Sequence, residues 1–268
     1  MTRIKITDAM WNGWMGKILY VPLLNILVLL YVYIPGQDLG LAIIVLTILI
    51  RLVLYPSYRD SLKSQRDLQK VQPKIDQIKA QHKDDSQKQS QEVMKIYKEH
   101  NINLFASCLP LIIQLPILLA LYRVFIAGLD TSSLVHLYSW FPHPPTELHT
   151  TFLAWLHIPG LVVDLTTRNI YLAILAGAVQ FFQSWLTTRY HHAPKTDKPQ
   201  LFNTQLMMYI FPVMTLVIAW SLPAALGLYW TTTTVAMAVQ MIIIYTSLQR
   251  RDARAANQPT DDQGRKTD

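Results

Sequence analysis

The feature that most constrains this chain is an arginine inside an apolar run. Residues 39–56 read LGLAIIVLTILIRLVLYP, and Arg51 is their one charged residue. A helix of this length rises about 27 Å, close to the thickness of the hydrocarbon core of a bilayer. An arginine near the centre of such a span costs about 2.5–3.5 kcal/mol on membrane-insertion scales. We therefore expect the rest of the chain to supply surroundings that stabilise Arg51.

Long apolar blocks separated by polar stretches are typical of a multi-pass membrane protein. Of the 268 residues, 51% are hydrophobic and 15% are charged, and the blocks are long enough to cross a bilayer. The net charge of +7 fits basic residues that flank membrane spans better than a nucleic-acid-binding surface. The single cysteine, Cys108, excludes an intramolecular disulfide. We predict five membrane spans, at residues 39–56, 103–127, 169–187, 201–220 and 224–248.

The segment 57–102 between the first two spans is strongly polar. Residues 57–100 hold ten Lys/Arg and seven Asp/Glu, with sparse apolar residues on both sides of a polar cluster at 82–86. This pattern predicts a helical hairpin outside the membrane, with Pro73 beginning or kinking a helix. A disordered loop is the alternative interpretation.

The apolar stretch at residues 18–34 allows two interpretations. It contains Pro22 and three tyrosines, and seventeen residues are the short limit for a membrane span. Tyrosine is also favoured at the membrane surface, where an amphipathic helix lies in the plane of the interface. A transmembrane helix and an interfacial helix both fit this stretch.

The charges of the loops predict the orientation of the chain. Segments 57–100, 188–200 and 249–268 hold ten, three and five Lys/Arg, whereas 128–168 holds one. Five alternating spans place the first three segments on one side, and the positive-inside rule makes that side the cytoplasm. The C-terminus is therefore predicted to be cytoplasmic, with a polar, disordered tail after Arg250.

The spans carry polar side chains but no partner of opposite charge for Arg51. Residues 103–127, 170–188 and 201–248 contain no Asp or Glu. Arg51 either extends toward the cytoplasmic headgroups or faces a water-filled cavity between helices. Helical spacing aligns polar residues into one stripe on each of the first three spans, which favours the cavity over separate interhelical hydrogen bonds. These residues are Thr47, Arg51 and Tyr55, then Ser107 and Gln114, then Gln180, Gln183 and Ser184.

The sequence does not indicate an enzyme. The loop histidines lack metal-ligand spacing, glycine-rich phosphate loops are absent, and no Ser/His/Asp pattern lies at membrane depth. We predict no catalytic residues, no cofactor and no metal.

Several motifs, in order along the chain, resemble those of the YidC/Oxa/Albino group of membrane protein insertases. The resemblance covers about residues 14–250 and includes the first, second, fourth and fifth spans. Its motifs are Ile50-Arg-Leu-Val-Leu-Tyr-Pro56, Gln72-Pro-Lys-Ile75, Tyr97-Lys-Glu-His100, Cys108-Leu-Pro-Leu-Ile-Ile-Gln-Leu-Pro116, Ala120-Leu-Tyr-Arg-Val124, Met207-Met-Tyr-Ile-Phe-Pro212 and Gly227-Leu-Tyr-Trp230.

The resemblance implies an all-α membrane protein with five core helices around a hydrophilic groove. In the family this groove is open to the cytoplasm and contains one arginine, at the position of Arg51. A cytoplasmic helical hairpin follows the first core helix, and an interfacial helix precedes it. This favours the interfacial interpretation of residues 18–34, within a segment 1–38 that comprises an extracytoplasmic N-terminal tail and this helix. The implied groove comprises Arg51, Thr47, Tyr55, Ser107, Gln114, Gln180, Gln183, Ser184 and Trp230.

The implied function is insertion and folding of integral membrane proteins in the bacterial cell membrane. Polar or acidic segments of nascent clients would enter the groove, and lipids would surround it. The ribosome and the Sec translocon are further candidate partners, DNA is not, and a monomer would suffice. We expect a short form that lacks a large extracytoplasmic domain, with 128–168 as an extracytoplasmic loop and 188–200 and 249–268 as cytoplasmic segments.

Overall fold

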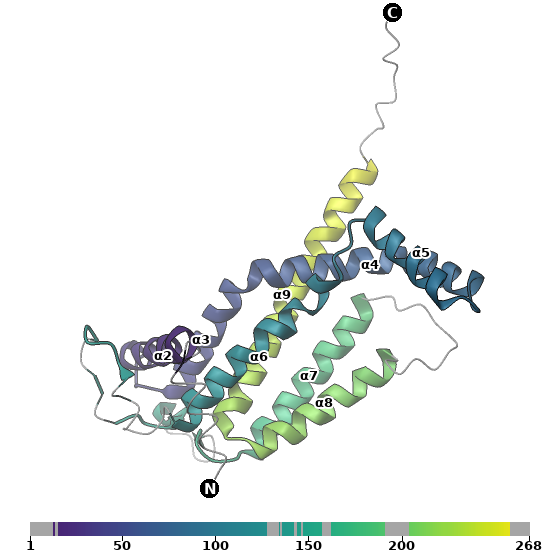
Figure 1. Ribbon diagram of the computed structural model, residues 1–268. Coiled ribbons are helices and arrows are strands. Elements are labelled where there is room, and N and C mark those ends of the chain that lie inside the picture. Colours follow the sequence, from purple (N-terminus) through teal and green to yellow (C-terminus); the bar gives the residue numbers. More distant parts are fainter. Residues whose placement is uncertain are drawn as a thin grey trace, which may run out of the picture.

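The structure is a computed structural model, and it is almost entirely helical (Figure 1). It describes residues 13, 16–127, 134, 136–141, 144–145, 147–156, 162–190 and 204–257. The predictions for the N-terminal tail, for most of the 188–200 loop and for the end of the C-terminal tail lie outside these residues. The expected class, an all-α membrane protein with a helical hairpin, is confirmed.

The N-terminal apolar stretch forms two joined helices, η1 (Gly16–Tyr20) and α2 (Val21–Tyr33), which pack against α6 and α3. Pro22 lies in the first turn of α2, where its missing N–H costs no helical hydrogen bond. Together the two helices are long and apolar enough to cross a bilayer. The interfacial placement of this segment therefore stays a prediction.

The arginine-bearing helix, α3 (Leu39–Val53), ends three residues earlier than the predicted span. The chain breaks at Leu54 and continues as α4 (Tyr55–Gln81), whose axis is inclined by 58° to that of α3. Pro56 explains the break, because it has no N–H to donate to the preceding helical turn. Tyr55 consequently belongs to α4 and does not continue the face of α3.

The charged segment is a helical hairpin, as predicted from its apolar spacing. Helix α4 contains Pro73 without a second break, and α5 (Ser86–Glu99) returns along it after a short turn. The Asp85 side chain begins α5 by accepting a hydrogen bond from the Lys88 N–H at 2.9 Å. The disordered-loop alternative is wrong for this segment.

The remaining helices are α6 (Leu104–Ala127), α7 (Ile170–Tyr190), α8 (Thr204–Ser221) and α9 (Ala224–Asn257). Between α6 and α7, strands β1 (Thr151–Phe152) and β2 (Val163–Asp164) pair antiparallel, with the 3-10 helix η3 (Ala154–Leu156) between them. Helix α9 continues to Asn257, so the predicted disorder directly after Arg250 is wrong. An ion pair between Arg66 of α4 and Asp252 of α9 contributes to this extension.

Helix α9 is the centre of the bundle and packs against α3, α4, α6, α7 and α8. Its C-terminal part extends past α4 (Figure 1). Many large apolar side chains of α3, α6, α7, α8 and α9 are exposed, among them Leu52, Ile112, Val213 and Ile243. An exposed apolar belt of this extent fits contact with lipid.

Within the described residues, α7 and the segment Ala224–Arg254 of α9 are long and apolar enough to cross a bilayer. The bent pair α3–α4 meets the same criterion when it is taken as one broken span. Helices α6 and α8 contain shorter apolar stretches, at Ile112–Phe125 and Met208–Ser221. All five predicted spans therefore correspond to helices, and their exact depth in the membrane stays a prediction.

Candidate functional site

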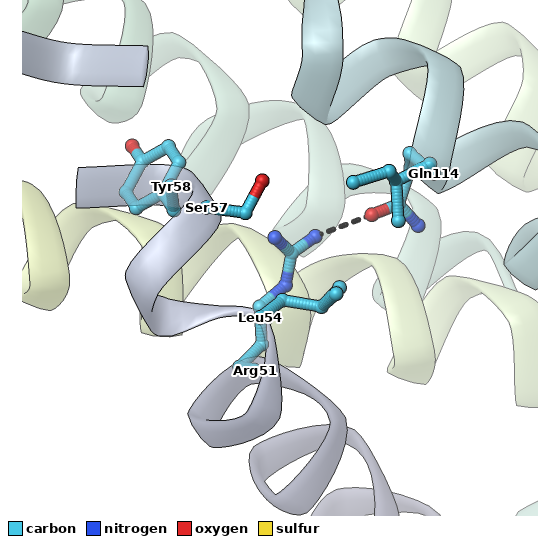
Figure 2. Close-up of a pocket in the computed structure, with 6 residues that line it drawn as sticks. Arg51, Leu54, Ser57, Tyr58 and Gln114 are labelled. Carbon is cyan, nitrogen blue, oxygen red and sulfur yellow. Dashed lines mark hydrogen bonds between the residues drawn. The ribbon is translucent and has the colours of Figure 1, made fainter. Parts of the chain in front are cut away.

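Arg51 lies in the last turn of α3 and points into the protein. Its side chain is buried, with the residue 5% exposed, and Nη2 donates a hydrogen bond to Gln114 Oε1 of α6 at 2.6 Å. Figure 2 shows the guanidinium directed at Gln114. An arginine that extended to the headgroups would not be buried between helices in this way. The structure therefore brings together Arg51 and Gln114, two of the residues predicted for the groove.

The acceptor Gln114 is itself held by α9. Its Nε2 donates a hydrogen bond to the Tyr229 hydroxyl, so Oε1 is the amide atom that faces Arg51. Tyr229 is 2% exposed, and this contact links α3, α6 and α9 through three side chains. A second contact to α9 comes from Gln240, whose Nε2 donates to the backbone carbonyl of Arg51 at 3.0 Å.

The guanidinium borders a small cavity between α3, α4 and α6. Leu54, Ser57, Tyr58 and Ile113 complete its lining, and its volume is about 10 Å³, on the order of one water molecule. Ser57 lies beside the guanidinium and the Tyr58 ring points away from it (Figure 2). The ion pairs between two described residues involve Arg66 and Lys70, and none involves Arg51. Arg51 thus has an amide where a buried arginine commonly has a carboxylate.

Tyr58 lines the same cavity but directs its hydroxyl toward α9. Burial raises the pKa of its phenol above the ordinary value, and the positive charge of Arg51 lowers it by a smaller amount. The hydroxyl therefore keeps its proton at neutral pH. It donates to the backbone carbonyl of Met237 in α9 at 3.5 Å.

The other predicted residues on the first two spans are placed differently. Thr47 is buried, and its hydroxyl donates to the Ile43 carbonyl of its own helix at 2.6 Å. Tyr55 is partly buried and packs beside Tyr58 and Met241 in an apolar cluster between α4, α7 and α9. Ser107 lies in α6, but its side chain is outside the described part of the structure.

On α7, the structure connects one predicted residue to α9. Gln180 Oε1 accepts a 3.5 Å hydrogen bond from Trp230 Nε1, the predicted groove residue of the last span. Gln183 is 7% exposed, and Ser184 is partly buried. These α7 side chains do not bond to Arg51 or Gln114 directly, but Gln183 hydrogen-bonds to Tyr58, which lines the Arg51 cavity.

Four buried polar atoms in the described residues have no hydrogen-bond partner in the protein. They are Ser57 Oγ, Gln183 Oε1, Thr233 Oγ1 and Gln240 Oε1. Ser57 lines the Arg51 cavity, and Gln240 contacts the Arg51 backbone. Buried polar atoms are normally paired, so Ser57 and Gln240 mark a place beside Arg51 that can accommodate water or polar groups of another molecule.

Sequence reasoning did not find three residues of this site: Ser57, Tyr229 and Gln240. One signal was available, because Gln240 is an amide in the middle of an otherwise apolar part of the last span and such residues commonly hydrogen-bond to a neighbouring membrane helix. Tyr229 directly precedes the predicted Trp230, but its contact with Gln114 depends on packing between α6 and α9. Within the described residues, no group of His, Cys, Asp and Glu is arranged to hold a metal.

Comparisons with known proteins agree with these features. The model of the 60Kd inner membrane protein family matches residues 30–251. A relative from Clostridium tetani, named membrane protein insertase YidC, is 35% identical over 82% of this chain and 87% of its own length. Another protein of that name, from Fusobacterium nucleatum, is 32% identical over 76% of this chain and 85% of its own length.

Other relatives are longer. An Actinobacillus pleuropneumoniae protein with the same name is 33% identical over 79% of this chain, but the match spans 34% of that relative. A crystal structure of an active YidC insertase with its first transmembrane domain resolved has a TM-score of 0.50 and 24% identity, over 89% of this chain and 46% of that one. The fold and the extent of the sequence match place this chain in the 60Kd inner membrane protein family.

Proposed function

We propose that this protein is a membrane protein insertase and chaperone, and that Arg51 receives polar or acidic segments of its clients. The observation that supports this most strongly is the buried guanidinium paired with an amide. A buried charge is stabilised best by an opposite charge, and the spans supply none. A client carboxylate would supply it.

The contacts suggest how a client would be received. Gln114 accepts one hydrogen bond from Arg51, whereas a guanidinium has five donors and matches a carboxylate with two parallel hydrogen bonds. A client Asp or Glu would replace Gln114 as the acceptor and form the stronger, charge-assisted contact. Because the cavity holds about 10 Å³, α6 has to move away from α3 for a client segment to enter.

A hydrophilic groove open to the cytoplasm is part of the proposal. Helix α9 packs against both α6 and α7, while α6 and α7 share no extensive packing among the described residues. The unpartnered atoms of Gln183 on α7 and Ser57 on α4 would keep the space between α6 and α7, which α9 borders, hydrated. A hydrated path shortens the apolar barrier that a polar client segment has to cross.

The energy for insertion would come from the client and the membrane. The client's apolar segment gains free energy by entering lipid, and a potential of 100 mV contributes about 2.3 kcal/mol for each negative charge that moves outward. Arg51 lowers the free-energy barrier to moving that negative charge through the membrane, and it is released unchanged. No nucleotide or metal is needed in this scheme.

The proposed orientation follows the positive-inside rule, and the proposed partners are those accessible on the cytoplasmic side. The α4–α5 hairpin and the C-terminus would face the cytoplasm of a bacterial cell, where nascent clients, the ribosome and the Sec translocon are accessible. Residues 57–100 hold ten Lys/Arg against seven Asp/Glu, and exposed lysines such as Lys74, Lys79, Lys88 and Lys95 would contact acidic partners. A monomer contains the whole proposed site.

Insertion into proteoliposomes tests this function against two alternatives, an anion transporter and a chaperone that does not translocate. The client has one span and an acidic tail, and protease protection of the tail measures its translocation. Arg51→Ala should reduce translocation about tenfold or more, as expected for losing a buried ionic contact, and Arg51→Lys should retain more activity than Arg51→Glu. If Arg51→Ala abolishes chloride flux and leaves insertion intact, the insertase proposal is wrong.

A further inference from the structure

The break between α3 and α4 leaves backbone groups of Arg51's helical turn in need of partners. The last four carbonyl groups of a helix have no hydrogen-bond donor within the helix, and Pro56 has no N–H to donate to them. Arg51 lies in this last turn, one turn before α4 begins. The direction of its side chain therefore depends on how the break is held.

Gln240 holds the break from α9. Its amide Nε2 donates to the Arg51 carbonyl at 3.0 Å, and the residue is 8% exposed. The contact is to the backbone and leaves the guanidinium available for Gln114. Gln240 is thus placed to act on Arg51 without changing the charge of the site.

The position of Gln240 on α9 pairs it with Tyr229. Eleven residues separate the two, about three helical turns, so they lie on nearly the same face of α9. Tyr229 holds the Gln114 amide, and Gln240 holds the Arg51 backbone. Helix α9 therefore contacts both partners of the Arg51–Gln114 hydrogen bond. Tyr229 bonds to the acceptor side chain, and Gln240 bonds to the backbone of the donor residue.

We propose that Gln240 is a positioning residue, which fixes the α3–α4 break against α9 and so directs the Arg51 guanidinium toward the client. The proposal rests on the function proposed above. Loss of the Gln240 donor should loosen residues 50–58 and weaken the recognition of acidic clients in particular. Clients that do not use Arg51 should be much less affected.

Gln240→Met tests this, because methionine has a similar length and shape but no N–H donor. In proteoliposomes made with the full chain, we expect translocation of the acidic-tailed client to fall about fivefold, the effect of one ordinary hydrogen bond. A client with the acidic residues replaced by Asn should lose less than about twofold. In an Arg51→Ala background, Gln240→Met should cause no additional loss.

Hydrogen exchange of the detergent-solubilised chain provides a readout that is independent of insertion. Peptides covering residues 50–58 should exchange faster in Gln240→Met. Thr234→Val is the matched control, since Thr234 is also buried on α9 but its hydroxyl donates to the Trp230 carbonyl of its own helix. It should change neither the exchange of 50–58 nor the preference for acidic clients.

Two results would overturn the role of Gln240: unchanged exchange at 50–58, or equal losses for acidic and neutral clients. Neither result affects the proposed insertase function. That function fails separately, if Arg51→Ala leaves the acidic-tailed client unaffected.

Discussion

The two ends of α3 are built in opposite ways. At the loop end, near Leu39, polar side chains are fully engaged: Asp38 accepts hydrogen bonds from the N–H groups of Leu41 at 3.0 Å and of Leu153 at 2.7 Å. At the hairpin end, near Val53, Arg51 has one amide acceptor, and neighbouring buried atoms have none. Polar groups at the loop end of the helix are paired within the protein, whereas those at the hairpin end can still form new polar contacts.

The loop end is held by hydrogen bonds between the described loop residues and several helices. Asn25 of α2 accepts from the Tyr138 N–H at 2.8 Å and donates to the His136 carbonyl at 3.1 Å. The N–H groups of Ala224 and Ala225 of α9 donate to the carbonyls of Thr167 and Leu165 at 2.8 and 3.0 Å. The described parts of residues 134–168 thereby connect α2, α3 and α9.

This difference indicates separate physical roles. An unpaired polar group in a protein interior costs about 1–3 kcal/mol, so the hairpin end gives up stability that the loop end keeps. Such a cost is expected where buried polar groups serve binding. The following predictions test whether polar groups stabilise the fold at the loop end and serve function at the hairpin end.

The largest loss of stability should follow Asp38→Ala. The change removes the cap of α3, worth about 1 kcal/mol, and a second hydrogen bond of the carboxylate, worth about 1.5–3 kcal/mol. We expect the free energy of unfolding, measured by SDS titration in detergent micelles, to fall by about 3 kcal/mol. Asp85→Ala, which removes an exposed cap with one hydrogen bond, should cost about 1 kcal/mol or less. Equal losses for both variants would contradict the special role of the loop end.

A smaller loss should follow Gly40→Ala. A methyl group on Gly40 would lie 2.8 Å from Phe152 Cβ and closer still to the ring atoms Cγ and Cδ2. Such overpacking typically costs about 1–3 kcal/mol, which exceeds the gain of up to about 1 kcal/mol from replacing glycine in a helix. We expect a net loss of about 1–2 kcal/mol in the same titration.

Two variants make this prediction specific. At Gly227 of α9 a methyl group would meet only Leu172 Cβ, at an ordinary 3.6 Å, so Gly227→Ala should be neutral or stabilising. Phe152→Ala should remove most of the penalty of Gly40→Ala when the two are combined. If Gly40→Ala is as harmless as Gly227→Ala, the close packing of the loop on α3 is not present in solution.

Sequence reasoning reached the helices because each depends on local apolar spacing. It also paired Arg51 with Gln114 in one groove, since an uncompensated charge in a span needs a polar neighbour. It placed the end of α3 too late, although Pro56 was a visible signal, because the apolar run continues to that proline. The continuation of α9 past Arg250 was missed, and the ion pair that contributes to it joins Arg66 and Asp252, which lie 186 positions apart.

The contacts that distinguish the two ends of α3 were beyond the reach of sequence patterns. Asp38 and Leu153 are separated by 115 positions, and Arg51 and Gln240 by 189. Helical periodicity shows which residues share a face of one helix, but it does not show which face of another helix they meet. The contacts of α9 with Arg51 and Gln114 could therefore be identified only from the structure.

The smallest effect on stability, and the sharpest test of the contrast, is expected for Thr233→Val. The hydroxyl of Thr233 is buried on α9 close to the Tyr229 side chain, without a hydrogen bond of good geometry, and valine has nearly the same shape. Replacing an unpaired polar group by an apolar one should leave the free energy of unfolding unchanged or raise it by up to about 1 kcal/mol. Translocation of the acidic-tailed client should nevertheless decrease, because one polar contact near Tyr229 is removed. A clear loss of stability would show that this hydroxyl is paired in the folded protein, and the two ends of α3 would then differ less than we infer.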